Sequence, residues 1–411
     1  MAIINPFPCI KPTKELASKV AALPYDVYNR KEACEAVKDN TYSFLRIDRA
    51  ETQFDDSVDT YDERVYAKAK ELLENMKAEG IYVKEEHPCY YVYELTMDGR
   101  VQTGIVACAS IDDYVNNVIK KHENTREEKE LDRIRHVDTC SAQTGPIFLA
   151  YRRNERINEV IGRVKKQEPI FSFTAEDEIG HVGYRIDNSE DIRMIQEEFS
   201  GIQEIYIADG HHRAASAVKV GLKRRQENPG YTGDEEFNFF LSVLFQEQEL
   251  MIMPYNRVVK DLNGFTEEEF LEEVAKTFEV KKIGNRAFEP ERKEKIAMYM
   301  DGIWYELTAR AEILSRDAVE GLDVSLLQNN VLGRILGIAD PRTDKRIDFI
   351  GGIRGLKELE RRCREDMKVA FAMYPTSIQE LFAVADAGQL MPPKSTWFEP
   401  KLRSGLFIHE I

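Results

Sequence analysis

Asp209 to Arg213 form the run DGHHR, in which an acid, a glycine, two imidazoles and a guanidinium follow one another. The run lies between the apolar segment IYIA and the helix-prone segment RAASAVKVG, which predicts a strand, a turn and a helix. The first backbone N–H groups of a helix lack partners within it, and the helix dipole favours an anion there. We therefore predict that this turn binds phosphate.

Each side chain of the run has a role in such a site. Gly210 permits close backbone approach, and Arg213 can bind two phosphate oxygens at once. His211 and His212 can donate hydrogen bonds and titrate near neutral pH. Asp209 is predicted to act as a general base or to hold Mg²⁺, and His212 is predicted to be catalytic. The alternative is an N-cap aspartate followed by loop histidines that bond to the backbone.

A zinc site is not predicted at this turn. Adjacent histidines at a helix start do not converge as an i, i+4 pair does, and no cysteine or third histidine is suitably spaced.

Two further motifs carry polar residues, ALPYDV near the start and HENTREEKELDR in the middle of the first half. Glu123 is predicted to be the base that takes the proton of an acceptor hydroxyl. The charged run around it is equally typical of a solvated helix face. The residues predicted to bind substrate are Tyr25, Asp26, His122, Thr125, Arg133 and, from MPYNRVV, Arg257.

The tail MPPKSTWFEPKLRSGL is basic and proline-rich in an acidic chain. Its adjacent prolines hold the following residues rigid, which favours a pre-formed anion site at Lys394, Ser395 and Thr396. The alternative is a terminal strand with a basic surface.

The surrounding pattern predicts an α/β protein with a mixed sheet. Asp98–Gly99 and Asp301–Gly302 are typical hairpin turns, SFLRID is predicted to be a strand, and TYDERVYAKAKELLENMKAEG has helical periodicity. Two regions are expected, 1–260 with the predicted catalytic residues and 261–411, whose tail (390–411) is expected to return to the active site.

Composition restricts the partners. The 411 residues carry a formal net charge of −16, which argues against broad nucleic-acid and membrane surfaces. The six cysteines lack CxxC spacing and are typical of reduced thiols, and no apolar signal segment opens the sequence. We expect a cytoplasmic protein. The sequence leaves open whether it forms a homodimer.

DGHHRAASA resembles the signature of the ParB/sulfiredoxin-like superfamily, which includes free L-serine kinases. Together with INPF, ALPYDV, HENTREEKELDR, MPYNRVV and MPPKSTWFEPKLRSGL, it makes the chain similar to a bacterial and archaeal family of unknown function. Leu23 stands where that family's PPYD motif has a proline.

The resemblance implies a ParB/sulfiredoxin-like core with additional α/β elements at both ends. It also implies phosphoryl transfer to a small hydroxyl metabolite, with serine as the leading acceptor, ATP, ADP or pyrophosphate as donor, and Mg²⁺. A non-enzymatic nucleotide-binding adapter and a phosphatase are the alternatives. Sulfiredoxin-like thiol chemistry is disfavoured, because no cysteine lies between Cys140 and Cys363.

Overall fold

The computed structural model describes all 411 residues, which form two compact units. The first comprises Met1–Leu250 and Pro400–Ile411, and the second comprises Met251–Glu399. The sequence predicts a division after residue 260, whereas the structure places it after Leu250. The reason is that strand β13 (Met251–Met253) pairs with β20 (Trp397–Glu399), so both belong to the second unit.

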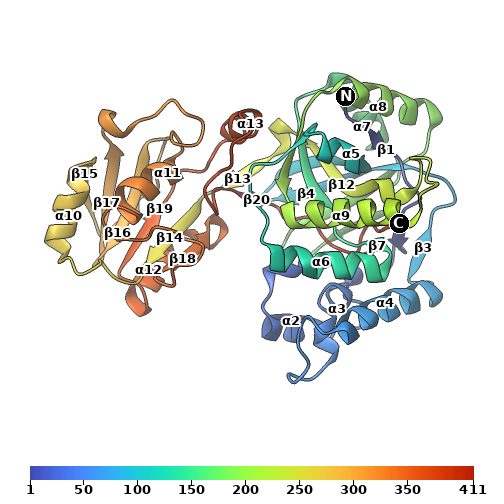
Figure 1. Cartoon of the computed structure of the whole chain (residues 1–411), viewed down its shortest axis with the longest axis horizontal. Coiled ribbons are helices and arrows are strands. Elements are labelled where there is room, and N and C mark those ends of the chain that lie inside the picture. The colour runs from blue at the N-terminus through green and yellow to red at the C-terminus, as the bar shows by residue number, and fades with distance from the viewer. The chain divides into compact units, whose positions relative to one another are not determined.

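A nine-stranded mixed sheet forms the centre of the first unit (Figure 1). Strands β11 and β6 are parallel, as are β12 and β8, and the remaining neighbours are antiparallel. The predicted α/β class with a mixed sheet is confirmed. In spatial order the strands are β6 (Ile119–Lys120), β11 (Ile205–Asp209), β8 (Ile147–Tyr151), β12 (Phe239–Gln246), β5 (Arg100–Ser110), β4 (Tyr90–Met97), β10 (Gly180–Ile186) and β9 (Phe171–Thr174), with β1 (Ile4–Asn5) on β5.

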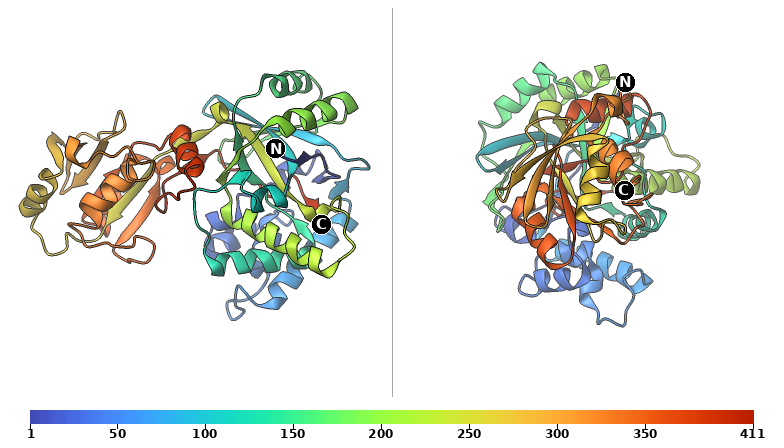
Figure 2. Two further views of the ribbon diagram at one scale, coloured as in Figure 1. Left: turned by 45° about the horizontal axis from the view of Figure 1, so that its top comes forward. Right: turned by 90° about the vertical axis from the view of Figure 1, so that its left-hand side faces the viewer.

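Helices cover one face of this sheet. Val92, Ile105, Leu149 and Ile207 come from four of its strands and share one core cluster with Ala214 of helix α9 (His211–Glu227). That cluster also takes in apolar side chains of α5 (Ile111–Val115), α7 (Glu155–Val164) and α8 (Ser189–Gly201). Helix α6 (Glu127–Cys140) lies beside α9 in both views (Figures 1 and 2). This covered face accounts for every second residue of these strands, because successive side chains point to opposite faces of the sheet.

The end of the chain covers the other face. Phe407 contacts the rings of Tyr91, Tyr93 and Phe171, with centroid distances between 5.4 and 5.7 Å. Short pairings hold this segment in place. They are β21 (His409–Glu410) with β7 (Ala142–Gln143), and the bridges Ile10–Ile408 and Ala22–Ser404. The tail beyond Pro400 is therefore an integral part of the first unit.

The N-terminal helices form a separate small core. Their bounds, and those of a strand pair beside them, are α1 (Ala17–Val20), α2 (Arg30–Val37), α3 (Leu45–Asp48), α4 (Glu63–Ala78), β2 (Ile10–Pro12) and β3 (Tyr82–Lys84). The prediction of a strand over SFLRID is wrong, because α3 occupies it. Phe44, Leu45 and Ile47 are buried there, and so short an apolar run fits a helical turn as well as a strand.

A six-stranded antiparallel sheet forms the second unit. Both predicted Asp-Gly hairpins are confirmed, with φ of +51° and +78° at Asp98–Gly99 and of +48° and +77° at Asp301–Gly302. No helix of the chain combines the length and apolar character that a bilayer crossing requires. The elements are β15 (Phe278–Gly284), β17 (Ile303–Ala309), β16 (Lys295–Met300), β19 (Val369–Ala372), β14 (Tyr255–Val259), β18 (Ile347–Gly351), α10 (Glu267–Ala275), α11 (Asp323–Leu327), α12 (Gly355–Glu365) and α13 (Ile378–Asp386).

Candidate functional site

The DGHHR run forms the predicted strand–turn–helix. Strand β11 ends at Asp209 with a register shift after Ile207, and helix α9 begins at His211. Gly210 is the N-cap, with φ of +93°, and no side chain caps the helix there. A Cβ at this position would lie 3.1 Å from Nε of Arg213. Glycine is thus required both for the left-handed backbone and for the close approach of the guanidinium.

The parallel pairing of β6 and β11 brings a second loop to the same edge of the sheet. This loop, His122–Arg126, follows β6 just as the DGHHR turn follows β11. The backbone N–H of Arg126 donates to Nε2 of His212 over 3.0 Å. With Nε2 as an acceptor, the neutral ring carries its proton on Nδ1. Burial lowers the pKa of His212, which also favours the neutral ring.

Asp209 is paired with a residue from the end of the chain. Nζ of Lys401 lies 3.2 Å from Oδ2, and Oδ1 accepts the backbone N–H of Gly210 over 2.9 Å. Burial alone would raise the pKa of Asp209, but the charges of Lys401 and Arg213 hold it well below its usual value. The carboxylate is therefore ionised at neutral pH. Its predicted role as a Mg²⁺ ligand stays a prediction, since Lys401 already neutralises it.

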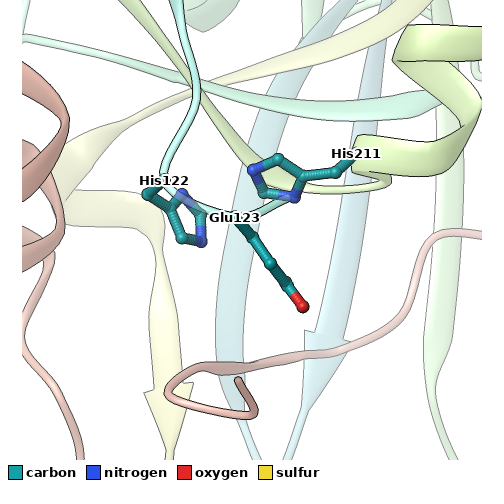
Figure 3. Close-up of side chains that lie close together, drawn as sticks. All are labelled: His122, Glu123 and His211. Atoms are coloured by element: carbon teal, nitrogen blue, oxygen red, sulfur yellow. The ribbon is translucent and has the colours of Figure 1, made fainter. Parts of the chain in front are cut away.

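His211 and His212 contact different residues of the His122–Arg126 loop, because His211 faces His122 whereas His212 accepts from Arg126. The ring of His211 packs edge-on against His122, with centroids 4.5 Å apart and planes at 90°. Both imidazoles are buried, and Glu123 extends beside them from the same loop as His122 (Figure 3). The structure thus separates the two adjacent histidines of the motif into different surroundings.

A pocket opens next to the first turn of α9. Its cavity volume for water is about 30 Å³, within about 470 Å³ of space between atoms that is partly open to solvent. Two arginines, Arg133 and Arg213, line it together with Tyr25, so three predicted site residues from distant motifs meet here. The other lining residues are Pro24, Asp48, His136, Val137, Gln143, Thr144, Gly145, Ile147, Ala217, Leu241 and Ser404.

Arg133 is almost fully buried, with 7% of its surface exposed, and neighbouring side chains fix its guanidinium in the pocket. Its Nε donates to Oδ2 of Asp132 over 2.9 Å, and its guanidinium lies 4.0 Å from the ring centre of Tyr25. Tyr66 donates to the other oxygen of Asp132 over 2.9 Å. Burial would lower the pKa of Arg133, but Asp132 raises it beyond its usual value, so the cation persists.

Arg213 is positioned by backbone rather than by an acid. Its NH1 donates to the carbonyl oxygen of Pro146 over 2.5 Å. Gly145 precedes Pro146. A Cβ at Gly145 would lie 3.1 Å from Oγ of Ser404 and 3.5 Å from NH1 of Arg213, so glycine leaves room for both side chains. The guanidinium consequently keeps its charge available for an anion in the pocket.

Two predicted substrate residues take different positions. Thr125 donates to Oε2 of Glu130 over 2.7 Å, which ties the loop to helix α6. Asp26, in a 3-10 turn at Tyr25–Val27, is exposed and acts electrostatically on His212. Their contact with a substrate stays a prediction.

The remaining predicted residues belong to the second unit and form a cluster of their own. Arg257 donates to the carbonyl oxygen of Lys394 over 3.1 Å, and the hydroxyl of Ser395 donates to that of Pro392 over 2.6 Å. The ammonium of Lys394 lies 5.3 Å from the ring centre of Tyr255. Binding of phosphate by Lys394, Ser395 and Thr396, and of substrate by Arg257, stays a prediction.

The sequence prediction missed several pocket residues, chiefly Asp48 and Thr144. The hydroxyl of Thr144 donates to Oδ1 of Asp48 over 2.9 Å. The signal for Thr144 is the sequence QTGPI, a polar residue with glycine and proline directly before a buried strand. The sequence around Asp48 does not indicate a site, because the segment SFLRID is predicted to be a strand.

Known proteins resemble the chain only remotely in structure. A free serine kinase in complex with AMP is 16% identical with a TM-score of 0.34, and the match covers 72% of this chain and 86% of that chain. SbnI with a C-terminal truncation, from Staphylococcus aureus, is 12% identical with a TM-score of 0.39, covering 72% and 82%. A conserved hypothetical protein from Pyrococcus furiosus is 14% identical with a TM-score of 0.34, covering 74% and 94%. At these values the similarities carry no argument about activity.

Comparison of sequences identifies a family. No curated protein matches the chain. The model of DUF1015, described as a protein of unknown function, matches residues 4–325 and thus most of the chain, including the DGHHR turn, the His122–Arg126 loop and most of the pocket. The chain therefore belongs to the DUF1015 family of proteins of unknown function.

Proposed function

We propose that this protein is a phosphotransferase that moves a phosphoryl group from a nucleotide or pyrophosphate to the hydroxyl of a small metabolite, with free L-serine as the leading acceptor. The observation that carries the proposal is the pocket in which Arg133 and Arg213 meet beside the uncapped start of helix α9. Two guanidiniums and a helix N-terminus at one place are suited to anions.

The donor phosphates belong at the turn. The uncapped first turn of α9 offers backbone N–H groups, and Arg213 adds a cation that also lowers the pKa of Asp209. His212 adds a neutral Nδ1–H donor, because its Nε2 is already used by Arg126. Mg²⁺ would arrive with the donor and be held largely by its phosphate oxygens, as this ion prefers.

The acceptor belongs in the pocket. Arg133 offers a positive charge and Asp48 a negative one, both lining the same small space. A zwitterionic amino acid presents a carboxylate and an ammonium group that complement this pair. The limited volume and the buried charges favour a small polar acceptor over a peptide or a nucleic acid.

The transfer requires little covalent chemistry from the protein. The acceptor oxygen forms a bond to the terminal phosphorus while the bond from phosphorus to the bridging oxygen of the donor breaks, and the shortened donor leaves with that electron pair. The hydroxyl proton passes to a carboxylate, for which we propose Glu123. Arg213 and the helix start stabilise the charge on the moving phosphoryl group.

The experiment is a transfer assay with the full chain. Purified protein is incubated with Mg²⁺, L-serine and ATP, ADP or pyrophosphate in turn, and O-phosphoserine is detected by phosphorus NMR and mass spectrometry. We expect product with one donor, loss of product in Arg213→Ala and in Arg133→Lys, and none of this loss in the exposed control Arg193→Ala. Absence of product across all donors and a panel of hydroxy metabolites would refute the proposal.

A further inference from the structure

Three groups able to bind a metal meet between β6 and α9. His122 and Glu123 follow β6, and His211 is the first residue of α9 (Figure 3). One ligand atom from each lies within 4.8 Å of the other two. Because β6 and β11 run parallel, the segments after them reach the same place, which explains the convergence of residues so far apart in sequence.

The buried imidazoles lack hydrogen-bond partners. His122 is 2% exposed and His211 is 6% exposed. By distance and angle, neither ring nitrogen of His122 nor Nε2 of His211 makes a hydrogen bond, although the backbone of Ile207 is near enough to His122 to act on its pKa. A buried polar atom without a partner costs about 1–3 kcal/mol, so three of them in contact call for an explanation. The edge-on packing of the two rings gives none of these nitrogens a hydrogen bond.

We infer that His122, His211 and Glu123 form a binding site for a divalent transition-metal ion of the zinc class, a site that does not depend on the proposed phosphotransfer. Two imidazole nitrogens and one carboxylate oxygen are ligands that Zn²⁺ accepts in proteins. The same set is poorly suited to Mg²⁺ and Ca²⁺, which prefer oxygen. Three protein ligands leave a fourth position of a tetrahedral ion open to water or to an anion.

The site needs only small movements to close around an ion. Ligand atoms about 2.1 Å from a tetrahedral metal lie about 3.4 Å from one another, somewhat closer than the 4.8 Å limit here. Glu123 is only partly buried and comes from a loop, so its side chain is the one that would move. Burial lowers the pKa of His211 and, to about 4, that of His122, which favours the neutral form that binds metals.

This inference departs from the sequence prediction, which argued against zinc. Adjacent histidines do not converge, as the sequence suggests, but His211 converges with His122 instead of with His212. The inference also affects Glu123, because a carboxylate bound to a metal is a poor base. If Glu123 is the base of the proposed transfer, occupation of this site would inhibit that transfer.

The test is metal binding by the full chain. The protein is stripped with a chelator and titrated with Zn²⁺, Co²⁺ and Mg²⁺ by calorimetry, and the Co²⁺ form is examined by visible absorption. We expect one Zn²⁺ per chain, a Co²⁺ spectrum typical of nitrogen and oxygen ligands in four-coordinate geometry, and no competition by Mg²⁺. The measurement requires no substrate and no activity, so its failure is distinct from that of the proposed function.

Variants decide which residues bind the ion. His122→Ala and His211→Ala are expected to lose stoichiometric binding, and Glu123→Gln to weaken it by about tenfold or more. Glu123→Gln is nearly isosteric and partly exposed, so it keeps the test valid if a histidine variant fails to fold. The exposed His87→Ala is the matched control and should bind as the unchanged protein does. Binding that survives Glu123→Gln and both folded histidine variants, or an unchanged protein that binds no Zn²⁺, would overturn the inference.

Discussion

Lys401 and Asp209 form an ion pair at 3.2 Å although 192 residues separate them in the sequence. The pair connects the end of the chain to the strand that leads into the DGHHR turn. Burial opposes the charge of Asp209, and Lys401 with Arg213 overcomes that effect. The carboxylate at the candidate phosphate site is thus controlled by a residue that lies far along the chain.

The first prediction concerns this pair. Lys401→Met should reduce phosphotransfer at least about tenfold, because Asp209 would face the donor phosphates with only Arg213 to compensate its charge. Stability should fall by about 1–3 kcal/mol, between the values for exposed and for buried pairs, because the pair is only partly exposed. Steady-state rates and thermal melts check both parts. Lys401→Arg keeps the charge and should retain most of the activity. An unaffected rate in Lys401→Met would exclude this role.

Gly210 provides a second prediction with a control elsewhere in the chain. Gly210→Ala and Gly80→Ala each force alanine into the left-handed region, at φ of +93° and +72°, and each should cost about 1–2 kcal/mol of stability. Only at Gly210 would the added Cβ meet a side chain, the guanidinium of Arg213, while nothing lies within 4 Å at Gly80. Nucleotide and phosphate binding should therefore be lost in Gly210→Ala alone. Equal binding by the two variants would contradict the proposed role of Arg213.

Arg133 can be tested apart from the stability that it provides. Arg133→Met leaves Asp132 buried without its cation and should cost about 3–5 kcal/mol of stability. Adding Asp132→Asn removes the unpaired buried charge and should restore much of the lost stability, as measured by urea unfolding. The double variant should still fail to bind serine, because the pocket has lost its cation. Serine binding by a folded double variant would show that the acceptor binds elsewhere.

The fourth prediction is a loss of stability in acid. His181 is fully buried, its Nε2 accepts from Nε of Arg403 over 3.2 Å, and its Nδ1 lies 2.8 Å from the hydroxyl of Tyr93. Burial, together with the charge of Arg403, lowers the pKa of His181 to about 3 from a usual value of 6.5. Between these values the unfolded chain binds a proton that the folded chain does not, so stability falls as the pH falls from 6.5 towards 3.

This single histidine should account for a stability loss of about 2 kcal/mol between pH 8 and pH 5. His181→Gln, which keeps an acceptor for Arg403, should be less stable at pH 8 but should flatten the pH dependence by that amount. Urea unfolding across the pH range measures it, with the exposed His87→Gln as control. A slope unchanged in His181→Gln would mean that His181 has the same pKa in the folded and the unfolded chain.

Local structure around the candidate site follows from short stretches of sequence. The strand, glycine turn and helix of IYIADGHHRAASA are all present, because an apolar β-prone run, a residue free to adopt positive φ and an alanine-rich run each act over a few residues. The prediction of the two Asp-Gly hairpins is confirmed for the same reason. SFLRID failed because its apolar spacing fits both a strand and a helical turn, and packing against α4 and the N-terminal core decided for the helix.

The sequence by itself determined that a helix start with an arginine and two histidines would follow a buried strand, since those preferences are local. Only the tertiary structure decided that His211 turns towards His122, that Lys401 reaches Asp209, and that Arg133 stands over Tyr25 in one pocket with Arg213. Those contacts depend on strand order, on the parallel pairing of β6 with β11 and on the return of the tail across the sheet. None of these is encoded in the spacing of neighbouring residues, because long-range pairing is set by the packing of the whole unit.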